Sequence, residues 1–231
     1  IIKREAAKLK GETVSVANSS DPYPRIEATL GLTRKCLEIL SESNCKIQII
    51  TKSNIVTRDD DLLCKVPSTV ALTITTEDDF LATQLEPRAP APTERIRAAQ
   101  DLIRKGIPTS VRIDPIIPNI NDYPEKLIAT LAAIGVRHIT SSTYKPKPDN
   151  WSRLTKAFPD IAEKLKPFYF RDGERIGGNI LLPKNYRFNL LKGVRDLAIA
   201  NGMKFGVCRE GLAQLNTASC DGSWMLGATV R

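Results

Sequence analysis

The chain has 231 residues and a mass of 25.5 kDa; 42% of its residues are hydrophobic, 26% are charged, and the formal net charge is +8. This composition is ordinary for a globular chain with a buried core, and it excludes a disordered, collagen-like or disulfide-stapled protein. No apolar run approaches the ~20 residues that a membrane helix needs, and no signal-peptide pattern opens the chain, so we expect a soluble, cytoplasmic protein.

Strand-like and helix-like segments alternate regularly along the first 144 residues. Short runs rich in β-branched residues predict strands at 13–18, 46–52, 69–76, 111–114 and 136–144. Apolar residues at helical spacing and glycine stop signals predict helices at 25–43, 59–66, from 77 onward, 93–105 and 124–134. This alternation predicts an α/β fold with a closed or partly closed parallel sheet. An open doubly wound sheet is the competitor, but no G-x-G-x-x-G follows the first strand.

After Lys145, strand-like and helix-like segments no longer alternate regularly. We expect helices near 151–165 and 186–200, a turn at Gly177-Gly178 and a strand at 204–207. We interpret residues 146–231 as an extension that covers a barrel core formed by residues 1–145. Between Lys145 and Arg195 there are twelve basic and five acidic residues, together with seven of the thirteen aromatic residues.

This basic, aromatic stretch has two interpretations. Cations interleaved with aromatic rings suit phosphate contact and base stacking, as nucleic-acid binders require. The competing interpretation, slightly favoured, is an amphipathic cover whose aromatic rings pack on the barrel while its lysines face water. The positive charge also suits a small anionic substrate or an acidic protein.

Polar residues follow the ends of the predicted strands, at 18–21, 52–53, 75–77, 114 and 143–145. In a β/α barrel these ends carry the chemistry, so we predict the site there. Ser19, Ser20 and Asp21 lie between a strand and a helix, where hydroxyl and carboxylate groups can bind an ammonium or a ribose. Helix capping explains the same residues, and spacing alone favours it.

The segments SSDPYPRIE, LTRKCLEIL, ITKSNIVTRDDDLL, TITTEDD, LEPRAPAPTERIRAA and GIPTSVRIDPIIPNIND occur in order between Thr13 and Lys145. This series resembles the radical S-adenosylmethionine enzymes of the spore photoproduct lyase-like branch. The resemblance implies a partial (β/α)6 TIM-like barrel that holds a [4Fe–4S] cluster and S-adenosylmethionine near the strand ends. It implies a 5′-deoxyadenosyl radical that abstracts hydrogen from substrate, and an electron donor such as a ferredoxin or flavodoxin.

The resemblance also implies roles for individual residues. Ser20 matches a serine that contacts the methionine part of the cofactor, and Lys52 matches a lysine that meets its carboxylate. Thr73 stands at the place of a serine near the ribose or methionine end, and Asp114 falls where the adenine is held. Arg112 lies on the same face of its strand and could add a charge to the pocket.

Some of these roles have alternatives. Arg112 is equally well explained by an ion pair with Glu86 or Asp114, and Asp21 either orients the Ser20 turn or caps the helix. The predicted cofactor-binding set is Ser19, Ser20, Asp21, Lys52, Thr73, Thr75, Arg112 and Asp114. No catalytic residue is assigned.

Two departures from the family matter. The family's C-x-x-x-C-x-x-C motif is absent from these 231 residues, and a cluster needs thiolate ligands. Because the chain starts at Ile1, we expect the cluster segment upstream of it, so that this chain alone lacks activity; loss during evolution is the alternative. Asn18 stands where spore photoproduct lyase has a hydrogen-donating cysteine, which argues against thymine-dimer reversal by that route.

The five cysteines form no C-x-x-C pair and their odd number suits reduced thiols in a reducing compartment. Cys36, Cys45 and Cys64 are expected in the core. Cys208 and Cys220 are interpreted as buried or idle thiols. A partial metal site with Glu210 or Asp221, and a radical-relay thiol, are the alternatives. The lone His138 is expected to be satisfied by packing and one hydrogen bond.

The sequence therefore carries three functional hypotheses. The first is a radical S-adenosylmethionine enzyme that acts on an anionic substrate, with nucleic acid as one candidate. The second is a degenerate barrel that binds S-adenosylmethionine or nucleic acid without catalysis. The third is a barrel enzyme in which Lys52 is an amine nucleophile that forms a Schiff base.

Overall fold

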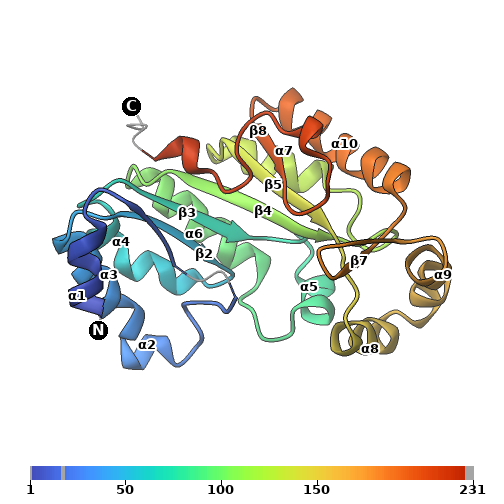
Figure 1. Ribbon diagram of the computed structural model, residues 1–231, viewed down its shortest axis with the longest axis horizontal. Coiled ribbons are helices and arrows are strands. Elements are labelled where there is room, and N and C mark those ends of the chain that lie inside the picture. The colour runs from blue at the N-terminus through green and yellow to red at the C-terminus, as the bar shows by residue number, and fades with distance from the viewer. Residues whose placement is uncertain (1, 17–18, 227–231) are drawn as a thin grey trace.

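The computed structural model describes residues 2–16 and 19–226 (Figure 1). Its strands are β1 (Thr13–Val16), β2 (Lys46–Thr51), β3 (Ser68–Thr73), β4 (Thr109–Ile116), β5 (His138–Thr143), β6 (Glu174–Ile176), β7 (Asn179–Leu181) and β8 (Lys204–Val207). Its α-helices are α1 (Ile2–Ala6), α2 (Glu27–Leu30), α3 (Leu32–Glu42), α4 (Asp60–Leu63), α5 (Asp79–Leu85), α6 (Pro92–Arg104), α7 (Glu125–Ala133), α8 (Pro148–Ala157), α9 (Pro159–Phe170) and α10 (Lys184–Ala200). A 3-10 helix, η2 (Asn54–Asp59), leads into α4.

Six strands form one sheet in the order β1-β2-β3-β4-β5-β8, and every neighbouring pair is parallel. The order follows the chain without the reversal that defines a doubly wound sheet. The predicted α/β fold with a partial parallel barrel is therefore confirmed. The sixth strand, β8, comes from the segment 146–231, so that segment contributes to the sheet as well as covering it. The division at residue 145 stays a prediction.

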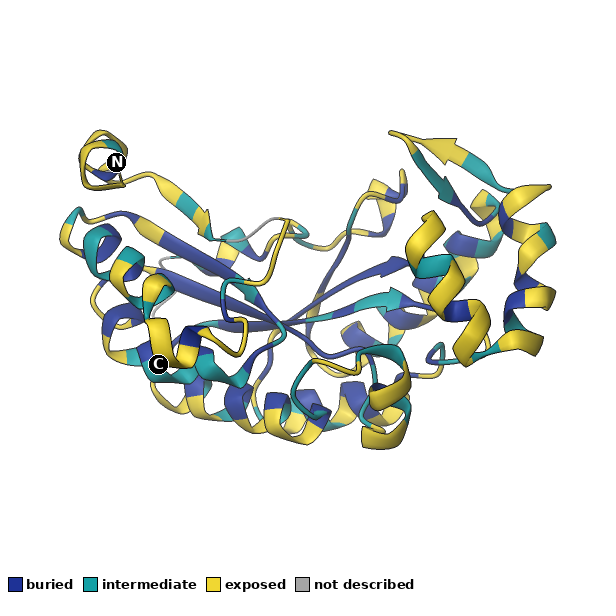
Figure 2. Ribbon diagram, turned by 90° about the horizontal axis from the view of Figure 1, so that it is seen from below, coloured by how far each residue is buried: buried dark blue, intermediate teal, exposed yellow. Residues whose placement is uncertain are grey.

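The two faces of the sheet differ sharply in chemistry. On one face Ile47, Ile49, Val70, Leu72 and Ile113 are buried in the main hydrophobic core, together with residues of α3, α6, α7 and α10. Figure 2 shows these helices gathered along one side of the sheet. Because side chains alternate along a strand, the other face carries Ile50 among a mostly polar or small set: Gln48, Lys52, Thr69, Ala71, Thr73, Ser110, Arg112, Asp114, Thr140, Ser142 and Gly206. Most side chains of this face are therefore unsuited to packing in the hydrophobic core and suited to polar contacts.

A C-terminal segment at 220–224 lies across the polar face near the beginnings of the strands. The carbonyl of Cys220 accepts a hydrogen bond from Thr140 Oγ1 at 2.7 Å, and that of Asp221 accepts one from Gln48 Nε2 at 3.2 Å. Trp224 Nε1 donates to Nδ1 of the fully buried His138 at 3.1 Å. Burial lowers the pKa of His138 to about 4, so the ring stays neutral and accepts this bond. His138 therefore has the packing role that the sequence predicts.

Two predicted helices are each divided in the structure. The expected helix 25–43 breaks at Gly31, whose φ of 60° lies in the left-handed region that suits glycine. The carboxylate of Glu27 accepts the amides of Leu32 and Thr33 at 2.9 Å each and so caps α3. The expected helix 151–165 is divided between α8 and α9, because Pro159 excludes a helical conformation at Phe158, which has φ −138° and ψ 66°.

The expected helix 59–66 is only the short α4 after η2, and the expected strand 69–76 ends at Thr73, whereas the other expected elements occur within a few residues of their predicted bounds. The glycine pair at 177–178 forms the turn of the β6–β7 hairpin. Residues 17 and 18, at the end of the first predicted strand, lie outside the described residues, and so does the expectation on Asn18. Within 2–16 and 19–226, no helix combines the length and the apolar character needed to cross a bilayer.

Candidate functional site

A hollow of about 280 Å³ lies at the carboxyl ends of β1, β2 and β3. Five of the eight predicted binding residues line it together: Ser19, Ser20, Asp21, Lys52 and Thr73. The other three lie elsewhere on the polar face. Thr75 borders a second cavity that Lys52 shares, and Arg112 and Asp114 form a pair further along the sheet. The carboxyl ends of parallel strands meet at one edge, which is why residues distant in sequence converge here.

Asp21 ties the loop after β1 to the end of β2. Its Oδ1 accepts hydrogen bonds from Thr51 Oγ1 at 2.6 Å and from the Tyr23 amide at 2.9 Å. Its Oδ2 accepts one from the Lys52 amide at 2.7 Å. The nearest helix begins only at Glu27. The N-cap of that helix is Ile26, so the helix-capping alternative for Asp21 is wrong, and its orientation of the Ser20 turn stays a prediction.

A buried tyrosine anchors the same loop from below. The Tyr23 hydroxyl donates to Asp59 Oδ2 at 3.0 Å, and both side chains are buried. Burial, with Asp59 adjacent, raises the pKa of Tyr23, so it remains a neutral donor. Arg34 and Arg58 lie 3.1 and 2.8 Å from Asp59 and balance its charge. In the sequence, the only signal for this contact is the run of charged residues around Asp59. The partners Tyr23 and Arg34 lie too far away along the chain to be assigned to Asp59 without the fold.

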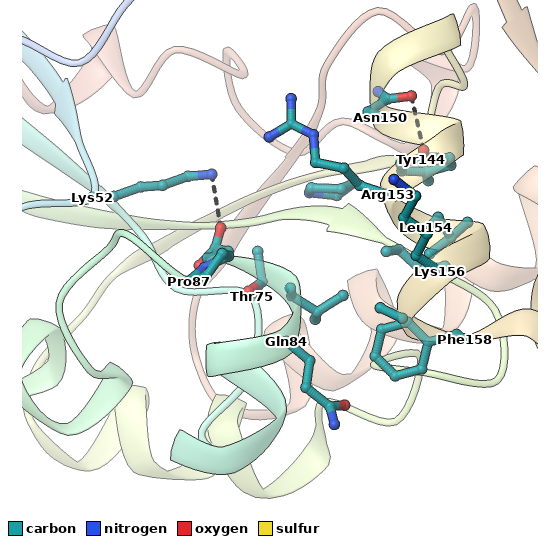
Figure 3. Close-up of a pocket in the computed structure, with 15 residues that line it drawn as sticks. Lys52, Thr75, Gln84, Pro87, Tyr144, Asn150, Arg153, Leu154, Lys156 and Phe158 are labelled. Carbon is teal, nitrogen blue, oxygen red and sulfur yellow. Dashed lines mark hydrogen bonds and ion pairs between the residues drawn. The ribbon is translucent and has the colours of Figure 1, made fainter.

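The Glu86 carboxylate lies between two cations beneath the hollow. Its Oε1 is 2.7 Å from Lys52 Nζ and its Oε2 is 2.8 Å from Arg95 (Figure 3 shows the Lys52 contact). Arg95 is fully buried and also donates to the Thr73 carbonyl at 2.7 Å. Burial by itself raises the pKa of Glu86, but attraction by Lys52 and Arg95 outweighs it and lowers that pKa.

This arrangement bears on the chemistry of Lys52. Its side chain is 42% exposed and borders three adjoining hollows, so its ammonium group is available to a ligand. Glu86 lies 2.7 Å from the ammonium group and is its partner in the described residues. The geometry supports anion binding by Lys52, and the Schiff-base hypothesis stays a prediction.

A larger cavity of about 510 Å³ adjoins the hollow and opens between α5 and α8 (Figure 3). Its walls include the apolar side chains of Leu85, Ile117, Leu154 and Phe158, and Arg153 and Lys156 lie at its rim. The buried Thr75 Oγ1 has no hydrogen-bond partner within the described part of the chain. A buried hydroxyl without a partner is costly, and a bound ligand would satisfy it.

Arg112 and Asp114 form an ion pair on the polar face at 2.6 Å, and Ser142 Oγ donates to the other Asp114 oxygen at 2.5 Å. Burial lowers the pKa of Arg112, but attraction by Asp114 outweighs it and raises that pKa. The ion-pair explanation of Arg112 is therefore confirmed with Asp114 as the partner. Glu86 instead pairs with Lys52 and Arg95.

The described residues do not fit a [4Fe–4S] cluster. Among residues 2–16 and 19–226, no group of three or more histidine, cysteine or acidic side chains is arranged to hold a metal ion. Glu210 accepts hydrogen bonds from Thr143 and Lys145 rather than joining Cys208 and Cys220 in a ligand set.

Cys45 is buried as expected, whereas Cys64 is exposed, because it follows the end of α4 at the surface.

The aromatic residues of the basic stretch pack against one another. Trp151 contacts Phe170 and Tyr169 edge-on, with ring centroids 5.0 and 5.8 Å apart, and Tyr144 meets Tyr169 at 6.0 Å. Leu154, Leu165 and Leu182 complete this second apolar cluster, defined by α8, α9 and the end of β5. These contacts support the interpretation as an amphipathic cover.

No protein-family model matches the chain. In fold it is similar to spore photoproduct lyase, with a TM-score of 0.65 at 16% identity over 84% of this chain and 60% of that one. It is also similar to SuiB of Streptococcus suis, with a TM-score of 0.55 at 14% identity over 91% of this chain and 42% of that one. The fold is thus the partial barrel of these radical S-adenosylmethionine enzymes.

Sequence relatives agree with the fold. The chain is 26% identical over 198 residues to the "Radical SAM Nalpha-GlyT isomerase" of Pseudomonas phage M6, covering 83% of this chain and 41% of the relative. It is 26% identical over 197 residues to an uncharacterized protein of Mycobacterium tuberculosis, covering 80% and 56%. The chain therefore spans about half the length of these curated relatives. Together these findings confirm the resemblance to radical S-adenosylmethionine enzymes.

Replacing Glu86 by glutamine tests the charge arrangement beneath the hollow. Glu86→Gln leaves the buried Arg95 without a counter-charge, so we expect the free energy of unfolding to fall by about 3 kcal/mol. Glu77→Gln is the matched control, because Glu77 pairs with the exposed Lys126 and should cost less than about 1 kcal/mol. Urea unfolding measures both. Equal losses in the two variants would contradict the assigned role of Glu86.

Proposed function

We propose that this chain forms the S-adenosylmethionine-binding part of a radical S-adenosylmethionine enzyme that acts on an anionic, nucleic-acid-like substrate. The observation that carries the proposal is the hollow that Ser19, Ser20, Asp21, Lys52 and Thr73 line together at the strand ends. Their convergence from three different strand ends gives one binding surface with hydroxyl, carboxylate and ammonium groups.

The side chains around the hollow suit the methionine end of the cofactor. The Lys52 ammonium would bind the carboxylate, and the hydroxyls of Ser19 and Ser20 would bind its polar groups from the loop that Asp21 holds in place. Thr73 lines the inner wall, and the unpartnered Thr75 hydroxyl adjoins it. When bound, S-adenosylmethionine supplies the adenosyl group that this class of enzymes uses to remove hydrogen from substrate.

The proposal places no iron–sulfur cluster on the described residues, because they do not bring suitable thiolates together. The ligands of a cluster, and an electron-donor protein such as a ferredoxin or flavodoxin, belong to the proposal as requirements of the complete enzyme. A degenerate barrel that only binds S-adenosylmethionine would have the same hollow but would not catalyse a radical reaction.

The cavity between α5 and α8 supports an anionic substrate. Lys52 lines both the cavity and the hollow, so a ligand in the cavity would lie beside the bound cofactor. Arg153 and Lys156 supply positive charge at its rim, and Leu154 and Phe158 supply an apolar wall for a ring. One spore photoproduct lyase structure similar in fold holds AdoMet and a dinucleoside spore photoproduct, which supports a nucleic-acid-like ligand beside the cofactor.

Cofactor binding is tested with Lys52→Ala. Loss of a charged partner for the carboxylate should weaken S-adenosylmethionine binding about 10-fold or more in calorimetry. Glu86 keeps Arg95, so the variant should remain folded. Lys126→Ala, which removes an exposed lysine away from the hollow, should bind as the unaltered protein does. Unchanged affinity in Lys52→Ala would overturn the proposed site.

Substrate binding is tested with the double variant Arg153→Ala/Lys156→Ala. We expect weaker binding of a single-stranded oligonucleotide in fluorescence anisotropy, with a shallower dependence on salt, because two phosphate contacts are lost. The control is Lys164→Ala/Lys166→Ala on α9, which removes the same charge outside the cavity. An equal loss in both would indicate diffuse attraction and contradict a specific role for the cavity.

A further inference from the structure

Two cysteines far apart in sequence meet on the polar face of the sheet. Cys208 directly follows β8 and lies on the same side of the strand as Gly206, two residues earlier. Cys220 packs directly on that strand, since a Cβ added to Gly206 would lie 2.6 Å from Cys220 Cα. The hydrogen bond from Thr140 to the Cys220 carbonyl holds the segment in this position. Cys208 and Cys220 thus lie next to each other on this face, and each thiol shifts the pKa of the other.

The charges around the pair activate one of the two thiols. A hydrogen bond from the Cys220 thiol and the nearby Arg112 guanidinium lower the pKa of Cys208 to about 6, against the opposing effects of burial and Asp114. The same hydrogen bond, burial and the nearby Asp221 raise the pKa of Cys220. The pair therefore combines one thiol whose pKa is lowered with one whose pKa is raised, which is the arrangement of a reactive dithiol.

The pair differs from the other cysteines of the chain. Cys208 and Cys220 are both partly exposed, so a small reagent can reach them. Cys36 is also partly exposed and Cys45 is buried, and burial raises the pKa of both. Cys64 is exposed, but partial burial of its sulfur and the adjacent Asp60 raise its pKa. Cys208 is partly exposed to solvent and its pKa is lowered, so it combines access with a preference for the reactive thiolate form.

We propose that Cys208 and Cys220 form a redox-active dithiol that small-molecule disulfides oxidise to an intramolecular disulfide. The Cys208 thiolate attacks one sulfur of the small disulfide and releases one thiolate, which leaves a mixed disulfide. Cys220 loses its proton and attacks Cys208 Sγ, which releases the second small thiolate. The dithiol is thereby oxidised by two electrons, and the small disulfide is reduced to two thiols.

Oxidation changes the charge of the polar face. The disulfide is neutral, so Arg112 loses one of its two anionic neighbours and keeps Asp114. The proposal stands on the contacts of the two cysteines and does not depend on the identity of the ligand in the hollow.

The test uses oxidised glutathione on the reduced protein at pH 7, followed by intact-mass measurement and peptide mapping. We expect a product lighter by two hydrogens with Cys208 linked to Cys220, and its reversal by dithiothreitol. The variant Cys220→Ser should stop at one glutathionyl group on Cys208. Cys64→Ser is the control and should form the same internal disulfide as the unaltered protein.

Alkylation by iodoacetamide provides a second measurement that does not depend on disulfide formation. The rate at Cys208 should rise with pH around a midpoint near 6 and should exceed the rate at Cys64 at pH 7. The charged and titrating groups that act on Cys208 are Cys220, Arg112 and Asp114, and Asp221 acts on Cys220. Failure to form the internal disulfide, or a Cys208 that reacts no faster than Cys64, would overturn the proposal.

Discussion

The candidate site depends on the neutralisation of one buried cation. Arg95 is fully buried beneath the strand ends, and a buried charge is stable only when it is paired. Glu86 supplies the counter-charge and extends its other oxygen to Lys52, while Arg95 also binds the Thr73 carbonyl. The same interaction therefore stabilises the fold, positions the end of β3 and presents an ammonium group at the hollow.

The chemistry of the sheet explains why the site has room. One face is apolar and packs against helices, and the other carries mostly small and polar side chains that do not fill the space above them. The C-terminal segment covers this face near the beginnings of the strands through Gln48 and Thr140. The hollow and the adjoining cavity lie at the opposite, carboxyl ends of the strands.

Much of the fold could be predicted from local pattern, because β-branched runs and glycine stops act over a few residues. The breaks at Gly31 and Phe158 were missed although their causes are local, because Gly31 adopts a left-handed φ beside the Glu27 cap and Pro159 excludes the helical region at Phe158. Convergence of Ser20, Lys52 and Thr73 followed from the resemblance and the strand ends. The pairings of Glu86 with Arg95, and of Cys208 with Cys220, could not be predicted, because each joins residues that only the folded sheet brings together.

Hydrogen–deuterium exchange with and without S-adenosylmethionine tests the central claim most directly. The account predicts slower exchange of backbone amides around 19–24, 51–54 and 73–76 when the cofactor is added, with α9 unchanged, because a ligand in the hollow orders the loop that Asp21 holds and the adjoining strand ends. Protection confined to other parts of the chain, or no protection at saturating S-adenosylmethionine, would contradict the account.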